Sequence, residues 1–118
     1  MKKILLISAL VFISQFAFSQ TIPLDSVYKY KGKTVTVCSK VVDIYMSKDK
    51  KGGTYLNFGK PFPYQTFQVV IFKKDLGNFS YNPFEFLEQK NVCVTGEVIF
   101  FKGKPEIIAT KEAQIKVE

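Results

Sequence analysis

The chain has 118 residues and a formal net charge of +7, from 17 basic residues that are all Lys and 10 acidic residues. A chain of this length holds one small domain and no second module. Because it contains no His, no Arg and only 2 Cys, it lacks a His general base, a typical metal cluster and the Arg with which a nuclease would hold phosphate. We therefore expect no enzyme, no metal and no cofactor.

The first residues are typical of a secretory signal peptide. Two Lys residues follow the initial Met, an apolar run comes next, and Ala17 and Ser19 place small residues three and one positions before a cut. The apolar run is too short for a stable membrane span, and a buried amphipathic helix is the less favoured alternative. We predict a signal peptide over residues 1–19 and a single domain over 20–118, exported to the periplasm or secreted, with no membrane span after cleavage.

Beyond this leader, segments rich in Val, Ile, Thr and aromatic residues alternate with turns rich in Gly, Pro and Lys. The predicted strands cover residues 34–46, 54–58, 66–72, 91–101 and 106–118. Asp25 to Tyr30 is expected to form one helical turn. Asn82 before Pro83 has the pattern of a helix start, so a short helix is predicted to end near Gln89.

The predicted order is three strands, a short helix and two strands, within roughly 85 residues. This is the arrangement of the Greek-key barrel called the OB-fold. The predicted fold class is therefore all-β, a five-stranded OB-fold barrel with a short helix between strands 3 and 4. A nine-residue pattern with three Val residues occurs in both strand 1 and strand 4. Because side chains alternate along a strand, these valines are expected to point into the core. They are Val35, Val37 and Val41, and Val92, Val94 and Val98.

The two Cys residues lie on the two strands that share this pattern. Strands 1 and 4 of an OB barrel are antiparallel neighbours, and the pattern aligns residues whose numbers sum to 131, so Cys38 is expected opposite Cys93. In an exported protein this placement suggests a cross-strand disulfide. Two half-buried free thiols that fill space as small apolar groups are the alternative.

Nearly all of the predicted mature chain resembles small bacterial OB-fold domains of the nucleic-acid-binding, anticodon-binding-like type. The segments that carry the resemblance are "GKTVTVCSKVV", "TYLNFGKPFPYQTFQVVIF", "FLEQKNVCVTGEVIFFKGKPEII" and "QIKVE". "TYLNF" with "FQVV" is similar to two strands of the anticodon-binding domains of class II synthetases, in which an outward aromatic side chain stacks on a base. The resemblance implies a stacking role for Tyr55 and a base-contacting role for Gln68. This sequence has Asn57 and Gly59 where those domains usually carry Asp and Arg.

Residue parity independently predicts one outer face on the hairpin of strands 2 and 3. An odd register sum places Tyr55, Asn57, Gln68, Val70 and Phe72 together on the outside. The same register turns Leu56, Phe58, Phe67, Val69 and Ile71 inward. We predict the outer set to be an aromatic and amide platform for a ligand. The alternative is that these are ordinary cross-strand pairs on a solvated edge.

Lys residues in the neighbouring loops are predicted to rim this platform with positive charge. They are Lys48, Lys50 and Lys51 in the first loop, Lys60 in the second, and Lys102 and Lys104 in the last, while Phe62 and Tyr64 extend the aromatic surface. Aromatic surfaces and cations together are what single-stranded nucleic acid requires. Single-stranded DNA or RNA is therefore the leading ligand, and a glycan or another exported protein is the alternative. The sequence leaves the oligomeric state open.

Overall fold

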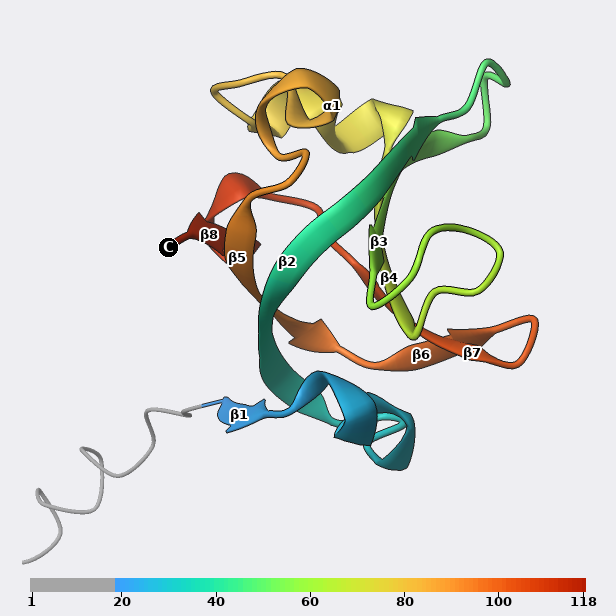
Figure 1. The fold of residues 1–118 in the computed structure, drawn as a ribbon. Helices are drawn as coiled ribbons and strands as arrows, with labels where there is room; N and C mark the ends of the chain where they lie inside the picture. The colour runs from blue at the N-terminus through green and yellow to red at the C-terminus, as the bar shows by residue number, and fades with distance from the viewer. Residues whose placement is uncertain (1–18) are drawn as a thin grey trace, which may run out of the picture.

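Residues 19–118 are described by the computed structural model of the protein, and they are built mainly from β-strands (Figure 1). The strands of this part are β1 (Gln20–Ile22), β2 (Thr34–Met46), β3 (Gly53–Phe58), β4 (Phe67–Phe72), β5 (Asn91–Glu97), β6 (Ile99–Phe101), β7 (Lys104–Ile108) and β8 (Ile115–Val117). Its helices are α1 (Pro83–Phe86) and the 3-10 helices η3 (Leu24–Lys29), η4 (Lys73–Asn78) and η5 (Glu112–Gln114). The predicted signal peptide, apart from Ser19, lies outside the described residues.

The long strand β2 pairs with different strands along its length. Its first half pairs antiparallel with β5, and its second half pairs antiparallel with β3. The change of partner coincides with a break in register between Val41 and Asp43. A bulge of this kind bends a strand and increases its twist, so a single strand of 13 residues serves two parts of the sheet.

The eight strands among residues 19–118 form one mixed sheet in the order β6-β7-β4-β3-β2-β5-β8, with β1 parallel to β2. The protein is mostly β, as predicted, but the prediction of a closed five-stranded barrel is corrected. The predicted strand 91–101 divides at Val98, whose backbone bonds to Gly32 and Lys33 instead of to a strand. As a result β5 pairs with β2 and β8, whereas β6 pairs with β7. The predicted strand 106–118 divides into β7 and β8, with η5 between them.

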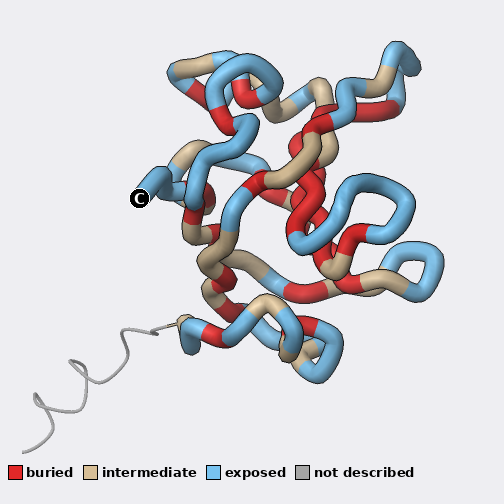
Figure 2. Tube along the Cα trace, viewed as in Figure 1, coloured by how far each residue is buried: buried red, intermediate tan, exposed pale blue. Residues whose placement is uncertain are grey.

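The core lies on the inner face of this curved sheet. The predicted register of β2 and β5 is confirmed, since Thr34 lies opposite Glu97 and the pairing keeps the sum of 131 down to Lys40 and Asn91. All six valines of the repeated pattern are buried. The five inward residues predicted for β3 and β4 are also buried, and the rings of Phe58 and Phe67 lie 5.4 Å apart. Figure 2 shows these strands buried and the connecting loops largely exposed.

The short helix after Asn82 ends earlier than predicted. The cap at Asn82 is confirmed, because its Oδ1 accepts a hydrogen bond of 3.0 Å from the backbone N–H of Phe84, but α1 ends at Phe86 rather than near Gln89. Gln89 has a φ of 64°, which is outside the helical range. The helical turn predicted before the first strand is the 3-10 helix η3. None of the helices in residues 19–118 is long and apolar enough to span a membrane.

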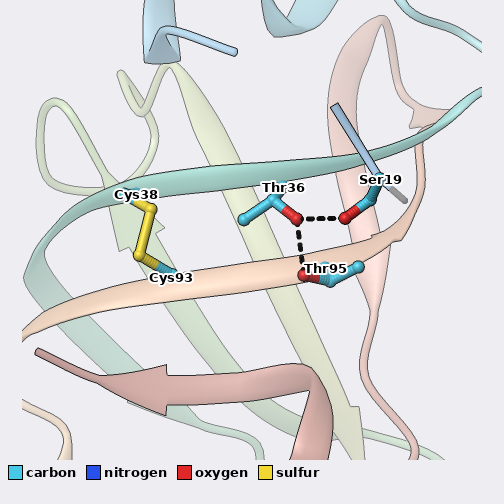
Figure 3. Close-up of a disulfide and its surroundings, with 5 residues drawn as sticks. All are labelled: Ser19, Thr36, Cys38, Cys93 and Thr95. Atoms are coloured by element: carbon cyan, nitrogen blue, oxygen red, sulfur yellow. Dashed lines mark hydrogen bonds between the residues drawn. A yellow bond between two sulfur atoms is a disulfide. The ribbon is translucent and has the colours of Figure 1, made fainter. Parts of the chain in front are cut away.

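A disulfide joins β2 to β5 on the outer face of this strand pair (Figure 3). It links Cys38 to Cys93, whose Cα atoms are 4.0 Å apart. A short Cα spacing is typical of the close, non-hydrogen-bonded pairs of an antiparallel ladder. Two residues along on the same face, the hydroxyl of Thr36 contacts that of Thr95 at 2.7 Å and that of Ser19 at 2.5 Å.

Candidate functional site

A row of four polar side chains crosses the outer face of the sheet from β2 to β7. The register places Asp43 on β2 opposite Asn57 on β3, and Asn57 opposite Gln68 on β4. The parallel pairing of β4 and β7 then places Glu106 beside Gln68. Paired residues in neighbouring strands point to the same face, so these four side chains form one line, which we call the polar ladder.

Hydrogen bonds along the polar ladder run in one direction. Gln68 Nε2 donates to Asn57 Oδ1 at 2.7 Å, and Asn57 Nδ2 donates to Asp43 Oδ2 at 3.2 Å. The same carboxylate oxygen of Asp43 accepts the backbone N–H of Phe62 at 3.2 Å. Asp43 therefore holds both the amide of Asn57 and the loop that carries Phe62. Buried polar groups need such partners, because an unpaired one costs free energy.

A second row beside the polar ladder is aromatic and aliphatic. Tyr45 lies opposite Tyr55, and their ring centroids are 6.0 Å apart with a tilt of 31°. Tyr55 lies opposite Val70, which in turn pairs with Ile108. Tyr45 is exposed and Tyr55 is half-buried, so both rings offer surface to a flat ligand.

The polar ladder, Tyr45 and Tyr55 line an open groove of about 770 Å³. One wall is the β3–β4 loop, with Phe62 and Pro63, and the other is the β6–β7 hairpin, with Phe101 and Lys102. Both connections extend from the same side of the sheet (Figure 1). Lys104 Nζ joins the walls by donating a hydrogen bond to the backbone carbonyl of Pro63. The groove thus has a floor of amide and carboxyl groups and a rim of aromatic rings.

Burial changes the titration of two groups in the groove. Desolvation raises the pKa of Glu106 above its ordinary value of 4.5. Desolvation, followed by the nearby carboxylate of Glu106, raises the pKa of Tyr55 above 10.0. The Tyr55 hydroxyl is therefore protonated at neutral pH and available as a hydrogen-bond donor.

The structure brings together only part of the predicted site. Tyr55, Asn57, Gln68, Phe62, Lys102 and Lys104 line the groove, whereas Phe72, Tyr64, Lys48, Lys50, Lys51 and Lys60 do not. The predicted open platform is also corrected. Asn57 is 0% exposed and Gln68 is 8% exposed, because both are engaged in the polar ladder beneath the β3–β4 loop. They form a floor rather than a flat exposed surface.

The groove-lining residues that sequence reasoning missed include Asp43, Tyr45, Gln65, Phe101 and Glu106. Parity alone could have placed Asp43 and Tyr45 on one face of β2. The bulge next to Asp43 and the parallel register of β7 decide which side chains they meet, and neither feature has a local sequence signal.

The outer face of β2 and β5 carries one group of atoms with metal-ligand chemistry. The sulfur atoms of Cys38 and Cys93 and a carboxylate oxygen of Glu118 lie within 4.8 Å of one another. A metal binds cysteine as the free thiolate, and these two sulfur atoms are bonded to each other. With the disulfide closed, the group is therefore not a metal centre.

No protein-family profile matches the sequence, and no curated protein matches it. Many solved structures are similar in fold, and two of them illustrate the likeness. A chain assigned as an aspartyl-tRNA synthetase from Leishmania major Friedlin superposes with a TM-score of 0.56 at 14% identity, over 87% of this chain and 21% of its own. An aspartyl-tRNA synthetase from Entamoeba histolytica superposes with a TM-score of 0.50 at 20% identity, over 75% of this chain and 19% of its own. The chain thus spans about a fifth of the length of these proteins, and the likeness, which is one of fold, agrees with an OB-fold.

Proposed function

We propose that this chain is an exported, non-catalytic OB-fold protein that binds single-stranded DNA or RNA in the groove. The groove itself carries the proposal, because aromatic rings at its rim stand over amide and carboxyl groups at its floor. Nucleobases are flat rings with polar edges, so their faces stack on aromatic side chains while their edges form hydrogen bonds. The similar solved structures are of enzymes named for tRNA, which supports nucleic acid as the ligand class.

The charge of the protein is also suited to a polyanion. The 15 Lys and 10 acidic residues of residues 20–118 give 15 − 10 = +5. Lys102 lines the groove. The four Lys residues of the β2–β3 and β3–β4 loops lie outside the groove, where they would contact the phosphates of a strand that continues beyond it.

A fluorescence-polarisation screen tests the proposal. Protein purified after expression of the full chain is titrated against short single-stranded DNA, RNA and neutral glycan probes at two salt concentrations. We expect binding to the oligonucleotides that weakens steeply with added salt, because phosphate contacts release counterions. Absence of oligonucleotide binding at low salt would refute the proposal.

A neutral glycan is the second candidate, and the two carboxyl groups at the floor of the groove favour it. Asp43 and Glu106 can accept hydrogen bonds from sugar hydroxyls, and the apolar faces of a sugar pack on Tyr45 and Tyr55. Glycan binding of this kind should hardly change with salt. Salt-independent glycan binding, with none to the oligonucleotides, would replace nucleic acid by this candidate.

Export is tested by the N-terminus of the purified protein. If the leader is removed as proposed, protein recovered from the periplasm or medium of a bacterial host begins at Gln20. Protein that retains Met1 and stays in the cytoplasm would contradict export without affecting the binding proposal.

A further inference from the structure

Gln65 presents a buried hydrogen-bond acceptor that the rest of the described chain does not use. It is the buried residue that follows the exposed part of the β3–β4 loop, and Thr66 separates it from β4. The residue is 7% exposed and lines the groove. No hydrogen-bond partner for its Oε1 lies among residues 19–118. A buried acceptor without a partner costs free energy, and this makes it a position where a ligand donor is favoured.

The backbone around Gln65 fixes the residue in this place. The N–H of Thr66 donates to the carbonyl of Phe58 at 2.9 Å, which closes the loop directly after Gln65. On the other side, the N–H of Tyr64 donates to the carbonyl of Pro61 at 2.9 Å. The side chain is therefore held at the groove by a closed loop rather than by a free segment.

The neighbouring polar ladder and the contact of Lys104 occupy several of the hydrogen-bond donors in the groove. Asn57 Nδ2 and Gln68 Nε2 donate within the ladder, and Lys104 Nζ donates to Pro63. Two of the lining residues add acceptors: Gln65, whose buried Oε1 has no hydrogen-bond partner among residues 19–118, and Glu106, with its carboxyl group. A ligand that fits these groups must bring hydrogen-bond donors on its edge.

We infer that Gln65 reads the edge of the bound base by accepting a hydrogen bond from an exocyclic amino group, so that bases with this group bind in preference to bases without it. This inference rests on the proposed binding of single strands. It names a contact residue and a chemical feature of the ligand. Tyr45 and Tyr55 stack on any base and supply no such preference.

Pairs of bases that differ by one amino group test the inference. A single adenine is compared with purine, and a single guanine with hypoxanthine, each at the centre of the same short uridine oligomer. We expect the wild-type protein to bind the amino-bearing member of at least one pair about three- to tenfold more tightly, the usual worth of one neutral hydrogen bond. Gln65→Leu should abolish this preference and leave stacking in place. Gln65→Glu, which keeps an acceptor, should retain it.

Gln20→Leu is the matched control, because Gln20 is exposed on β1 and lies outside the groove. It should leave the preference unchanged. Equal affinity within both pairs for the wild-type protein, or a preference that survives in Gln65→Leu, would overturn the inference while the binding proposal stands. No oligonucleotide binding at all would overturn both. Equal affinity within both pairs for the wild-type protein overturns the inference even if Gln65→Leu fails to fold.

Discussion

Tyr55 lies on β3 two residues before Asn57 and lines the groove, and it tests the stacking part of the proposal. Tyr55→Ala should weaken oligonucleotide binding by about 1 to 3 kcal/mol, the usual contribution of a base stacked on an aromatic ring. Fluorescence polarisation at low salt measures this change. Because the half-buried ring also packs against Tyr45, a modest loss of thermal stability is expected as well.

Tyr28→Ala is the matched control for Tyr55→Ala. Tyr28 is exposed on η3, and its ring contacts Lys29 rather than the groove. Its removal should leave affinity unchanged. Equal losses for the two variants would show that general surface aromaticity, and not the groove, accounts for binding.

Glu106 makes the free energy of unfolding depend on pH. Its pKa is raised in the folded protein, so its contribution to stability is present below the ordinary value of 4.5 and is lost as pH rises through the folded value. Relative to Glu106→Gln, the wild-type protein should therefore become less stable as pH rises above 4.5. Urea unfolding at a series of pH values measures the difference.

Glu112 provides a control of opposite sign for Glu106. Hydrogen bonds from Ser80 lower the pKa of Glu112, so its contribution is present above 4.5 and is lost as pH falls. The difference between wild type and Glu112→Gln should thus slope the other way. Slopes of the same sign for both residues would show that the burial of Glu106 does not set its titration.

At the scale of the elements, the polar ladder connects β2, β3 and β4 through one fully buried amide. Asn57→Asp removes the donor to Asp43 and places a second carboxyl group beside it. We expect the free energy of unfolding to fall by about 1 to 3 kcal/mol, because the carboxylate of Asp43 loses the Asn57 donor and like charges are brought together at a buried position. Chemical denaturation at neutral pH measures this loss.

Asn91→Asp is the matched control, because Asn91 is exposed at the start of β5. It should change stability little. If Asn57→Asp were equally mild, the polar ladder would not hold the groove floor together. The loss should also shrink in acid, where the new carboxyl group is neutral.

The hairpin of β3 and β4 shows how far residue parity predicts structure. Alternation placed Leu56 and Phe58 inside and Tyr55 and Asn57 outside, because only one register buries the apolar set. Parity could not show that Asn57 is covered. Asn57 is buried because Asp43 holds the β3–β4 loop and because β7 lies beside β4. Contacts between distant parts of the chain determine both of these features.

At the scale of the whole molecule, the sheet differs from prediction where strand pairing is non-local. The pairing of β2 with β5 was predictable because both strands carry the same Val pattern. The short β1 pairs parallel with β2, and its three residues carry too weak a signal to predict a strand. Val98 divides β5 from β6, but valine is not a residue type that predicts a turn. The break is therefore seen only in its tertiary hydrogen bonds to Gly32 and Lys33.

The disulfide ties together two distant parts of the chain and is expected to dominate overall stability. Cys38 and Cys93 are separated by 55 residues, and a cross-link that closes a loop of this length stabilises by about 4 kcal/mol in the chain-entropy account. The double variant Cys38→Ala with Cys93→Ala should lose about this amount in urea unfolding. Mass spectrometry of the unreduced wild-type protein should show no alkylatable thiol.

The double variant Thr36→Ala with Thr95→Ala is the matched control. These two residues face each other on the same strands and the same face as the cysteines, but no covalent bond joins them. Loss of their contact should cost only about 1 kcal/mol. A loss no larger for the cysteine variant would contradict a bridge that constrains the unfolded chain. The disulfide lies on β5 and on the first half of β2, whereas the groove is lined by the second half of β2 and by β3, β4 and β7, so the folded cysteine variant should keep full oligonucleotide affinity. Weakened binding by folded protein would instead mean that the bridge positions the groove.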